Sequence, residues 1–306
     1  MAYFCDIAKF IKCYEGNRRL KSFMDYFYLV LTSVALAGSN IVGGFYNKKE
    51  GTPLIYNIAV ATAAAIFFLI ASGFKFSVSG EMFLYSVLFG ICYAVFFLSQ
   101  LKSIKEGSVS LTALVTSYSL ILPTLFGIFA YKEYPSYLFY IGFALFMASL
   151  CFIVWPRDKN TLKITKKWAF YVSLAFLSNG MCSVFLNAFQ KKSGGAQKCE
   201  FMLFAMLVAI VISVIALLIN KDKSRLNVKR TVVYGGICGI MNATVNFLAM
   251  VLAVSAIPLS VIYPTLSAGS LVLSTLISAF AFKEKPDALG ILGLILGVIA
   301  LVLLNI

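Results

Sequence analysis

The chain has 306 residues, of which 61% are hydrophobic and only 12% are charged. Soluble domains carry roughly 45–50% apolar and about 25% charged residues, so this composition excludes an ordinary water-soluble domain. The net charge of +14 does not indicate a nucleic-acid partner, because the basic residues sit in short connectors between apolar runs. We expect those residues to orient the chain in a membrane and to contact anionic lipids.

The first 23 residues form a basic leader without an unbroken apolar core or a small-residue cleavage site. Its apolar residues recur at roughly helical spacing, which predicts an interfacial helix lying on the membrane. A start at Met24, which would remove this leader, is the alternative.

Apolar runs bounded by charge, Gly or Pro predict ten transmembrane helices, each near the ~20 residues that a bilayer requires. The first five lie near residues 24–44, 54–73, 82–101, 108–131 and 136–155. The second five lie near residues 165–189, 200–219, 231–254, 257–281 and 287–305. The predicted fold class is therefore all-α and integral to the membrane, and we expect a multi-pass protein of the plasma (cell inner) membrane.

One heptapeptide occurs twice. FAYKEYP at Phe129–Pro135 returns as FAFKEKP at Phe280–Pro286, 151 positions later. An odd number of spans per repeat reverses the second copy in the membrane, so we predict two inverted five-helix repeats, over residues 24–155 and 165–306.

The shared FxxKExP pattern predicts a turn between the fourth and fifth helices of each repeat, with Pro in the first turn of the next helix. Its structural residues are Lys132, Glu133, Pro135, Lys283, Glu284 and Pro286. We interpret the four charges as solvated helix ends rather than catalytic groups, because ionised residues are common there.

This layout resembles the drug/metabolite transporter superfamily, in particular its ten-helix EamA-like members. Those repeats end in a Gly-Glu turn and a Gly-rich closing helix, and here the matching stretches are KEYPSYLFYIGF and KEKPDALGILGLILGVIALVLLN. AGSNIV, Ala37 to Val42, is similar to the family's Trp-Gly-Ser-Asn stretch, with Ala37 in place of Trp, and Lys132 and Lys283 replace the usual Gly. The resemblance implies both termini in the cytoplasm, whereas the distribution of basic residues favours the opposite orientation.

Small polar residues share one helix face in the fourth and ninth predicted spans. They recur every three or four residues at Ser108, Thr112, Thr116, Ser119 and Pro123, and again at Tyr263, Ser267, Ser270 and Ser274, with Pro264 nearby. Inverted-repeat transporters bind substrate near the midplane, so we hypothesise a neutral polar cavity between spans one, three, four, six, eight and nine. The candidate substrate-binding residues are Asn40, Tyr93, Thr112, Thr116, Ser119, Asn179, Asn242, Asn246, Tyr263, Ser267 and Ser270. Ordinary helix packing through small residues is the alternative interpretation.

We therefore expect a secondary transporter of a small organic metabolite, such as an amino acid or a related polar solute, working by alternating access. No Asp or Glu falls in a span centre, which favours a facilitator, an exchanger or coupling through a carboxylate near the surface. An exporter of lipophilic compounds and a non-transporting membrane scaffold are the alternatives.

We do not expect an enzyme, because the chain has no His and so excludes HExxH zinc sites and Ser-His relays. The seven cysteines include no CxxC pair, and we expect no disulfide, metal or cofactor. The expected partners are a small-molecule solute and the lipid bilayer, with no nucleic acid, and a homodimer is left open.

Overall fold

Long apolar helices make up nearly all of the described chain, and no strand occurs among the described residues. The computed structural model describes residues 23–42, 46, 53–74, 76–106, 112, 115–154, 165–219, 228–281 and 288–306. Its helices are Phe23–Val42, α2 (Pro53–Ala71), α3 (Gly80–Glu106), α5 (Ile121–Tyr131), α6 (Tyr137–Val154), α7 (Lys166–Lys192), α8 (Lys198–Ile219), α9 (Val228–Ala253), α10 (Leu259–Ala281) and α11 (Ala288–Leu304). The expectation of an all-α fold is confirmed for these residues.

Six of these helices are long and apolar enough to cross a membrane, judged by length and composition. They are Phe23–Val42, Leu54–Ala71, Gly80–Glu106, Lys166–Lys192, Lys198–Ile219 and Lys229–Ala253. Four shorter apolar helices of 10–17 residues are Val115–Tyr131, Tyr137–Phe152, Leu259–Ser274 and Ala288–Leu304. The chain thus has the helices of a multi-pass membrane protein, while ten complete spans stay a prediction.

The helix that contains α5 is not uniform. It runs over Val115–Tyr131, and a 3-10 turn, η1 (Tyr118–Leu120), precedes α5 within it. Pro123 follows this turn and has no backbone N–H, so it cannot pair with the carbonyl of Ser119 four residues earlier. Residues 1–22 of the predicted leader, residue 108 and the second turn at 282–287 lie outside the described residues.

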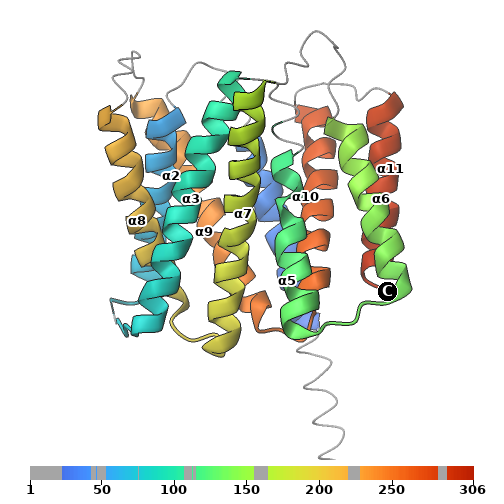
Figure 1. Ribbon diagram of the computed structural model, residues 1–306, viewed down its shortest axis with the longest axis horizontal. Helices are drawn as coiled ribbons and strands as arrows, with labels where there is room; N and C mark the ends of the chain where they lie inside the picture. Colours follow the sequence, from blue (N-terminus) through green and yellow to red (C-terminus); the bar gives the residue numbers. More distant parts are fainter. Residues whose placement is uncertain are drawn as a thin grey trace, which may run out of the picture.

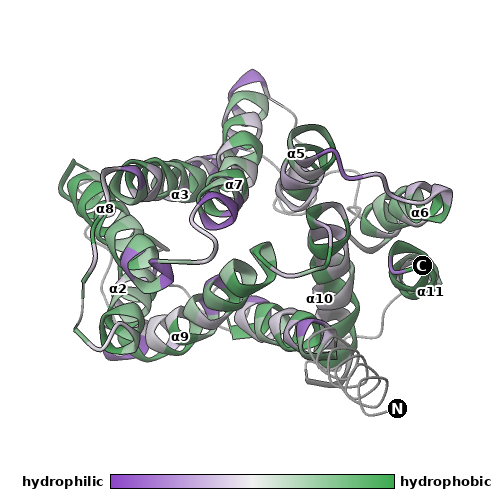
Figure 2. Cartoon of the chain, turned by 90° about the horizontal axis from the view of Figure 1, so that it is seen from below, coloured by the Kyte–Doolittle hydropathy of each residue, from purple (hydrophilic) through white to green (hydrophobic). Residues whose placement is uncertain are grey.

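The helices run up and down between two ends of the molecule (Figure 1). The connectors 132–136, 193–197 and 254–258 lie at the same end, which we call the lower end, together with the start of Phe23–Val42 and the end of α11. Seen from below, α2, α3, α8 and α9 form one side of the molecule, while α6 and α11 lie together at the far side, beyond α5 and α10 (Figure 2). Most helix surface is hydrophobic, as expected for helices that face lipid.

Close helix packing uses small residues. α2 packs on α9, where a Cβ added to Gly235 or Gly239 would come 2.6 Å from the Cβ of Ala59 or Ala63, respectively. Both pairs are spaced four apart, the small-xxx-small arrangement that lets membrane helices approach closely. Gly236 lies next to Gly235 on the same helix, and its Cβ position meets no atom within 4 Å.

These two environments on α9 give a matched test. We expect Gly239→Ala to lower the melting temperature, since its Cβ would also come 2.6 Å from the carbonyl oxygen of Val60, and overpacking costs about 1–3 kcal/mol. Gly236→Ala should leave the melting temperature unchanged or raise it slightly. Equal melting temperatures for the two variants in the same detergent would contradict this packing.

Candidate functional site

The polar stripe predicted in the fourth span faces α7. Thr112, Thr116 and Ser119 are all buried. Trp168 Nε1 donates a hydrogen bond of 3.0 Å to Thr112 Oγ1, and Asn179 Nδ2 donates one of 2.6 Å to Ser119 Oγ. Thr116 Oγ1 donates to the carbonyl of Thr112 at 2.9 Å. The structure therefore brings four of the predicted residues together, and uses them to join two helices.

Three residues of the corresponding stripe on α10, Tyr263, Ser267 and Ser270, are buried as well. Ser270 Oγ donates to the backbone carbonyl of Ser267 at 3.0 Å, so the Ser270 side chain is bonded within its own helix. Tyr263 differs, because its hydroxyl accepts a hydrogen bond from Asn187 Nδ2 of α7. Tyr263 is thus the residue of this stripe whose side chain is hydrogen-bonded to another helix, through the Asn187 amide of α7.

The two asparagines predicted on α9 form a pair. Asn246 Nδ2 donates to both the carbonyl and Oδ1 of Asn242, each at 2.9 Å. Both residues are half-buried, and among the described residues no partner is found for Asn242 Nδ2 or Asn246 Oδ1. This leaves one donor and one acceptor accessible in the second half of α9.

Two other predicted residues do not join these contacts. Tyr93 stacks on Phe89 of its own helix, with ring centroids 6.3 Å apart, and packs against the apolar cluster that includes Cys182 and Met250. Asn40 is exposed. It follows Ser33 by two helical turns, and Ser33 lies next to Gly269 of α10, so Asn40 shares the helix face directed at α10.

Two amides that the sequence analysis missed lie at the centre of this arrangement. Asn187 and Gln190 of α7 both have 0% exposure. Asn187 Nδ2 bonds Tyr263 and also the Ser183 carbonyl at 2.5 Å, and Gln190 Nε2 points to Met250 Sδ at 3.5 Å. Their oxygens, Asn187 Oδ1 and Gln190 Oε1, have no hydrogen-bond partner. The sequence carried a signal, since Asn179, Ser183, Asn187 and Gln190 recur at intervals of four, four and three.

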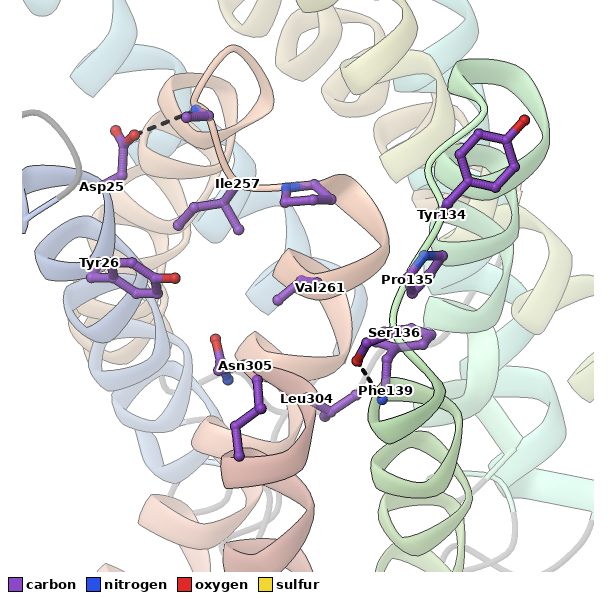
Figure 3. Close-up of a pocket in the computed structure, with 13 residues that line it drawn as sticks. Asp25, Tyr26, Tyr134, Pro135, Ser136, Phe139, Ile257, Val261, Leu304 and Asn305 are labelled. Carbon is purple, nitrogen blue, oxygen red and sulfur yellow. Dashed lines mark hydrogen bonds between the residues drawn. The ribbon is translucent and has the colours of Figure 1, made fainter. Parts of the chain in front are cut away.

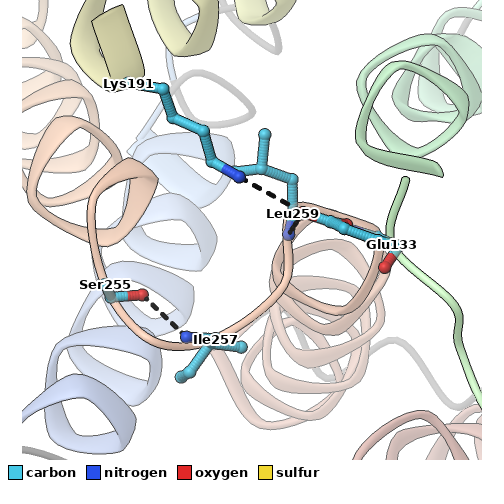
Figure 4. Close-up of polar contacts among 6 residues, drawn as sticks. Glu133, Lys191, Ser255, Ile257 and Leu259 are labelled. Carbon is cyan, nitrogen blue, oxygen red and sulfur yellow. Dashed lines mark hydrogen bonds and ion pairs between the residues drawn. The ribbon is translucent and has the colours of Figure 1, made fainter. Parts of the chain in front are cut away.

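Below the buried amides, an ion pair joins three segments at the lower end (Figure 4). Glu133 Oε1 accepts from Leu259 N at 2.9 Å and Oε2 accepts from Ser260 N at 2.8 Å, so the carboxylate caps the first turn of α10. Lys191 Nζ lies 3.3 Å from Glu133 Oε1 and 3.9 Å from the centre of the Tyr131 ring. We call Glu133, Lys191 and the Leu259–Ser260 amides the lower clamp.

The lower clamp corrects one interpretation of the repeated turn. Glu133 is not a solvated helix end, because its side chain is only 11% exposed and its oxygens are bonded to α10. Lys132 is exposed as expected, but its φ of 52° lies in the left-handed region that glycine adopts most easily. Lys283, Glu284 and Pro286 lie outside the described residues.

Electrostatics favour the ionised form of Glu133. Burial acts to raise the pKa of its carboxyl group, but the amides of Ser260 and Leu259, the Ser260 side chain and Lys191 outweigh it. The pKa of Glu133 is therefore held below its ordinary value of 4.5. Carboxylates at helix N-termini are stabilised by the helix dipole in the same way.

Comparison with known proteins agrees with this architecture. A family model of sugar transport proteins matches residues 34–306, which is most of the chain. The chain is therefore a multi-pass membrane protein of a transport family. It belongs to the sugar transport protein family. No curated protein matches the chain. A protein known from a crystal structure shares the fold with a TM-score of 0.74 and 13% identity, over 91% of this chain and 98% of that chain.

The lowered pKa of Glu133 gives a prediction with a defined sign. Above pH 4.5 the ionised carboxylate stabilises the folded state, and this contribution is lost as pH falls through the lowered pKa. We expect Glu133→Gln to lose about 1–2 kcal/mol at pH 7, and the difference from the natural protein to shrink as pH approaches 3. Thermal unfolding in detergent between pH 7 and pH 3 measures this.

Glu81→Gln is the control for that experiment. Glu81 also pairs with a lysine, Lys192 at 2.8 Å, but both side chains are well exposed, so solvent screens the pair. This variant should unfold much like the natural protein. A stability difference for Glu133→Gln that stayed constant across the pH range would contradict the ionic role of the clamp.

Proposed function

We propose that this protein is a secondary carrier for a small, uncharged, polar solute, and that the solute binds at the amide groups of α7. The observation that carries the proposal is the pair of buried oxygens, Asn187 Oδ1 and Gln190 Oε1, which lack hydrogen-bond donors. A buried acceptor without a donor costs about 1–3 kcal/mol. A solute hydroxyl would remove that cost, so these atoms favour a ligand rich in hydroxyl groups.

The chemistry around these oxygens supports a sugar rather than a charged solute. Their hydrogen-bonding neighbours, Tyr263, Ser183 and Met250, are all uncharged. A zwitterionic amino acid would bring two full charges into this region, and each would need a partner of opposite sign. The name of the sugar transport protein family supports the same class of solute. Amino acids, expected from the sequence, are the second class to test.

We further propose that ten spans form two inverted repeats, over residues 24–155 and 165–306, as in EamA-like transporters of the drug/metabolite superfamily. Helix contacts support this. Counted along the chain from Phe23–Val42, α3 and α8 are the third and seventh helices, and their counterparts in the other repeat are α9, the eighth, and α2, the second. The symmetry therefore relates the contact of α3 with α8 to the contact of α9 with α2, and both contacts occur. In the same way, the contact of α5 with α7 corresponds to a contact of α10 with Phe23–Val42. Gly269 of α10 lies next to Ser33 of Phe23–Val42 in that contact.

We propose that the protein works by alternating access, as inverted-repeat transporters do. Asn187 and Tyr263 join α7 to α10, and the lower clamp joins the same two helices at their lower ends. In the described conformation the buried amides are closed off from water, since both residues have 0% exposure. A solute can reach them from the lower end only if α7 and α10 separate there. We therefore assign the lower clamp as the closing contact of that side. We also propose that the protein lies in the plasma membrane and has no catalytic role.

The solute site is tested with nearly isosteric apolar variants that preserve packing. Asn187→Leu and Gln190→Met remove an amide oxygen each, and we expect each to weaken binding of the recognised sugar about 10- to 100-fold, matching about 1–3 kcal/mol. Ligand-dependent thermal stabilisation across a panel of sugars, polyols, amino acids and quaternary amines measures this. Stabilisation by sugars identifies the solute class, whereas stabilisation by amino acids or lipophilic amines would replace it.

Asn57→Leu is the matched control. Asn57 is also a buried amide in a membrane helix, but it donates to Ser213 Oγ at 3.2 Å in the contact of α2 with α8, away from α7. This variant should lower the melting temperature without changing sugar affinity. If Asn187→Leu and Gln190→Met kept the natural affinity, the proposed solute site would be wrong.

The inverted topology is tested with single cysteines in a background without the natural cysteines. Tyr134 and Ala196 are exposed at the lower end, and Lys167 and Lys229 are exposed at the starts of α7 and α9 at the opposite end. Cysteines at the first two positions should react with an impermeant reagent from one side of a sealed vesicle, and those at the last two from the other side. Labelling of Tyr134 and Lys167 positions from one side would contradict ten spans.

A further inference from the structure

A cavity lies at the lower end, away from the buried amides. Its volume is about 310 Å³, within the range of small-molecule sites. It is lined by the start of Phe23–Val42, the connectors 134–136 and 256–258, and the end of α11 (Figure 3). Neither Asn187, Gln190 nor Tyr263 lines it.

Asp25 gives the cavity its chemistry. The residue is only 6% exposed, and its carboxylate accepts one long hydrogen bond, 3.4 Å from Ala256 N to Oδ2. Among the described residues that line the cavity, Asp25 is the only one with an acidic or basic side chain. A carboxylate removed from water loses several kcal/mol of solvation unless a cation or several donors replace it. One long backbone contact does not replace that solvation.

The other polar groups of the cavity add acceptors and aromatic faces. Asn305 Nδ2 donates to Leu301 O at 2.8 Å and to Thr265 Oγ1 at 3.2 Å, which leaves its oxygen available to accept. Tyr26 contributes an aromatic ring, whose face attracts cations. A carboxylate, an amide oxygen and an aromatic ring around one cavity match a cation that also donates hydrogen bonds.

We propose that this cavity binds the ammonium group of a small organic amine, with Asp25 as its counter-ion. An ammonium supplies both the charge and the donors that the Asp25 carboxylate lacks, and the volume of the cavity leaves room for the rest of a small amine. The ammonium comes either from a free amine in water or from the amine headgroup of a phospholipid, since the cavity is lined by connectors and the ends of helices.

The position of the cavity couples it to the lower clamp. Tyr134 and Pro135 directly follow Glu133, and Ile257 and Pro258 directly precede Leu259, whose amide Glu133 binds. An amine bound at Asp25 would therefore contact two of the three segments that the clamp joins. We expect such an amine to stabilise the closed lower end.

The test uses ethanolamine with the full chain, in detergent and in phosphatidylcholine nanodiscs. We expect a saturable rise in melting temperature with ethanolamine and none with ethylene glycol, a neutral molecule of similar size. Asp25→Asn, which keeps the shape of the side chain, should weaken ethanolamine binding at least 10-fold, while Glu81→Gln should not weaken it. Asn305→Leu provides a second variant, with an expected loss of several-fold, if Asp25→Asn does not fold.

Nanodiscs that contain phosphatidylethanolamine distinguish the two sources of the ammonium. A lipid headgroup is supported as the ligand if this lipid raises the melting temperature of the natural protein but not of Asp25→Asn. The additional rise caused by the lipid should then be smaller when free ethanolamine is already present. Saturable binding of free ethanolamine without a lipid effect supports the site with a soluble amine. No effect of either probe on the natural protein, or equal effects on Asp25→Asn, would overturn the proposal.

Discussion

The Glu133 carboxylate is the contact on which the lower end of the protein depends. It joins the connector after α5 to the start of α10 and to the end of α7, although these groups are 126 and 58 residues away in the sequence. The first amides of a helix have no partner within the helix, so a buried start needs an acceptor from elsewhere. Because α7 and α10 also carry Asn187 and Tyr263, the clamp fixes how the polar groups between them meet.

Inside the membrane, the same polar groups have to serve both packing and binding. Backbone and side-chain polar groups in hydrocarbon must be paired within the protein. α7 follows this rule by pairing Asn179 with Ser119 and Asn187 with Tyr263, on two different helices. On α7, the unpaired oxygens of Asn187 and Gln190 are the exceptions. Under the proposed function, a solute would supply the donors that these oxygens lack.

The sequence predicted the helices well because bilayer thickness and apolar length determine them. Most described helices begin and end within a few residues of the expected limits. α3 continues to Glu106, five residues beyond its predicted end, and the described fourth helix begins at Val115, later than the predicted residue 108. The partners of Glu133 could not be predicted, because they depend on how distant segments pack. Gln190 was missed because the predicted span ended at residue 189, and Asp25 was overlooked at the edge of the first span. Tyr93 was misleading, since an aromatic residue on a helix serves packing as readily as binding.

The most direct test of the account is whether the lower end opens. Spin labels at Tyr134 and Ala196, both exposed at that end, would report the distance between the connectors that flank the clamp, in nanodiscs with and without a bound sugar. We expect two distances between the labels, a short one from the closed state and a longer one from an open state. The populations of these two states should change when the sugar binds. A single distance that is the same with and without a bound sugar would contradict a carrier that opens at the lower clamp.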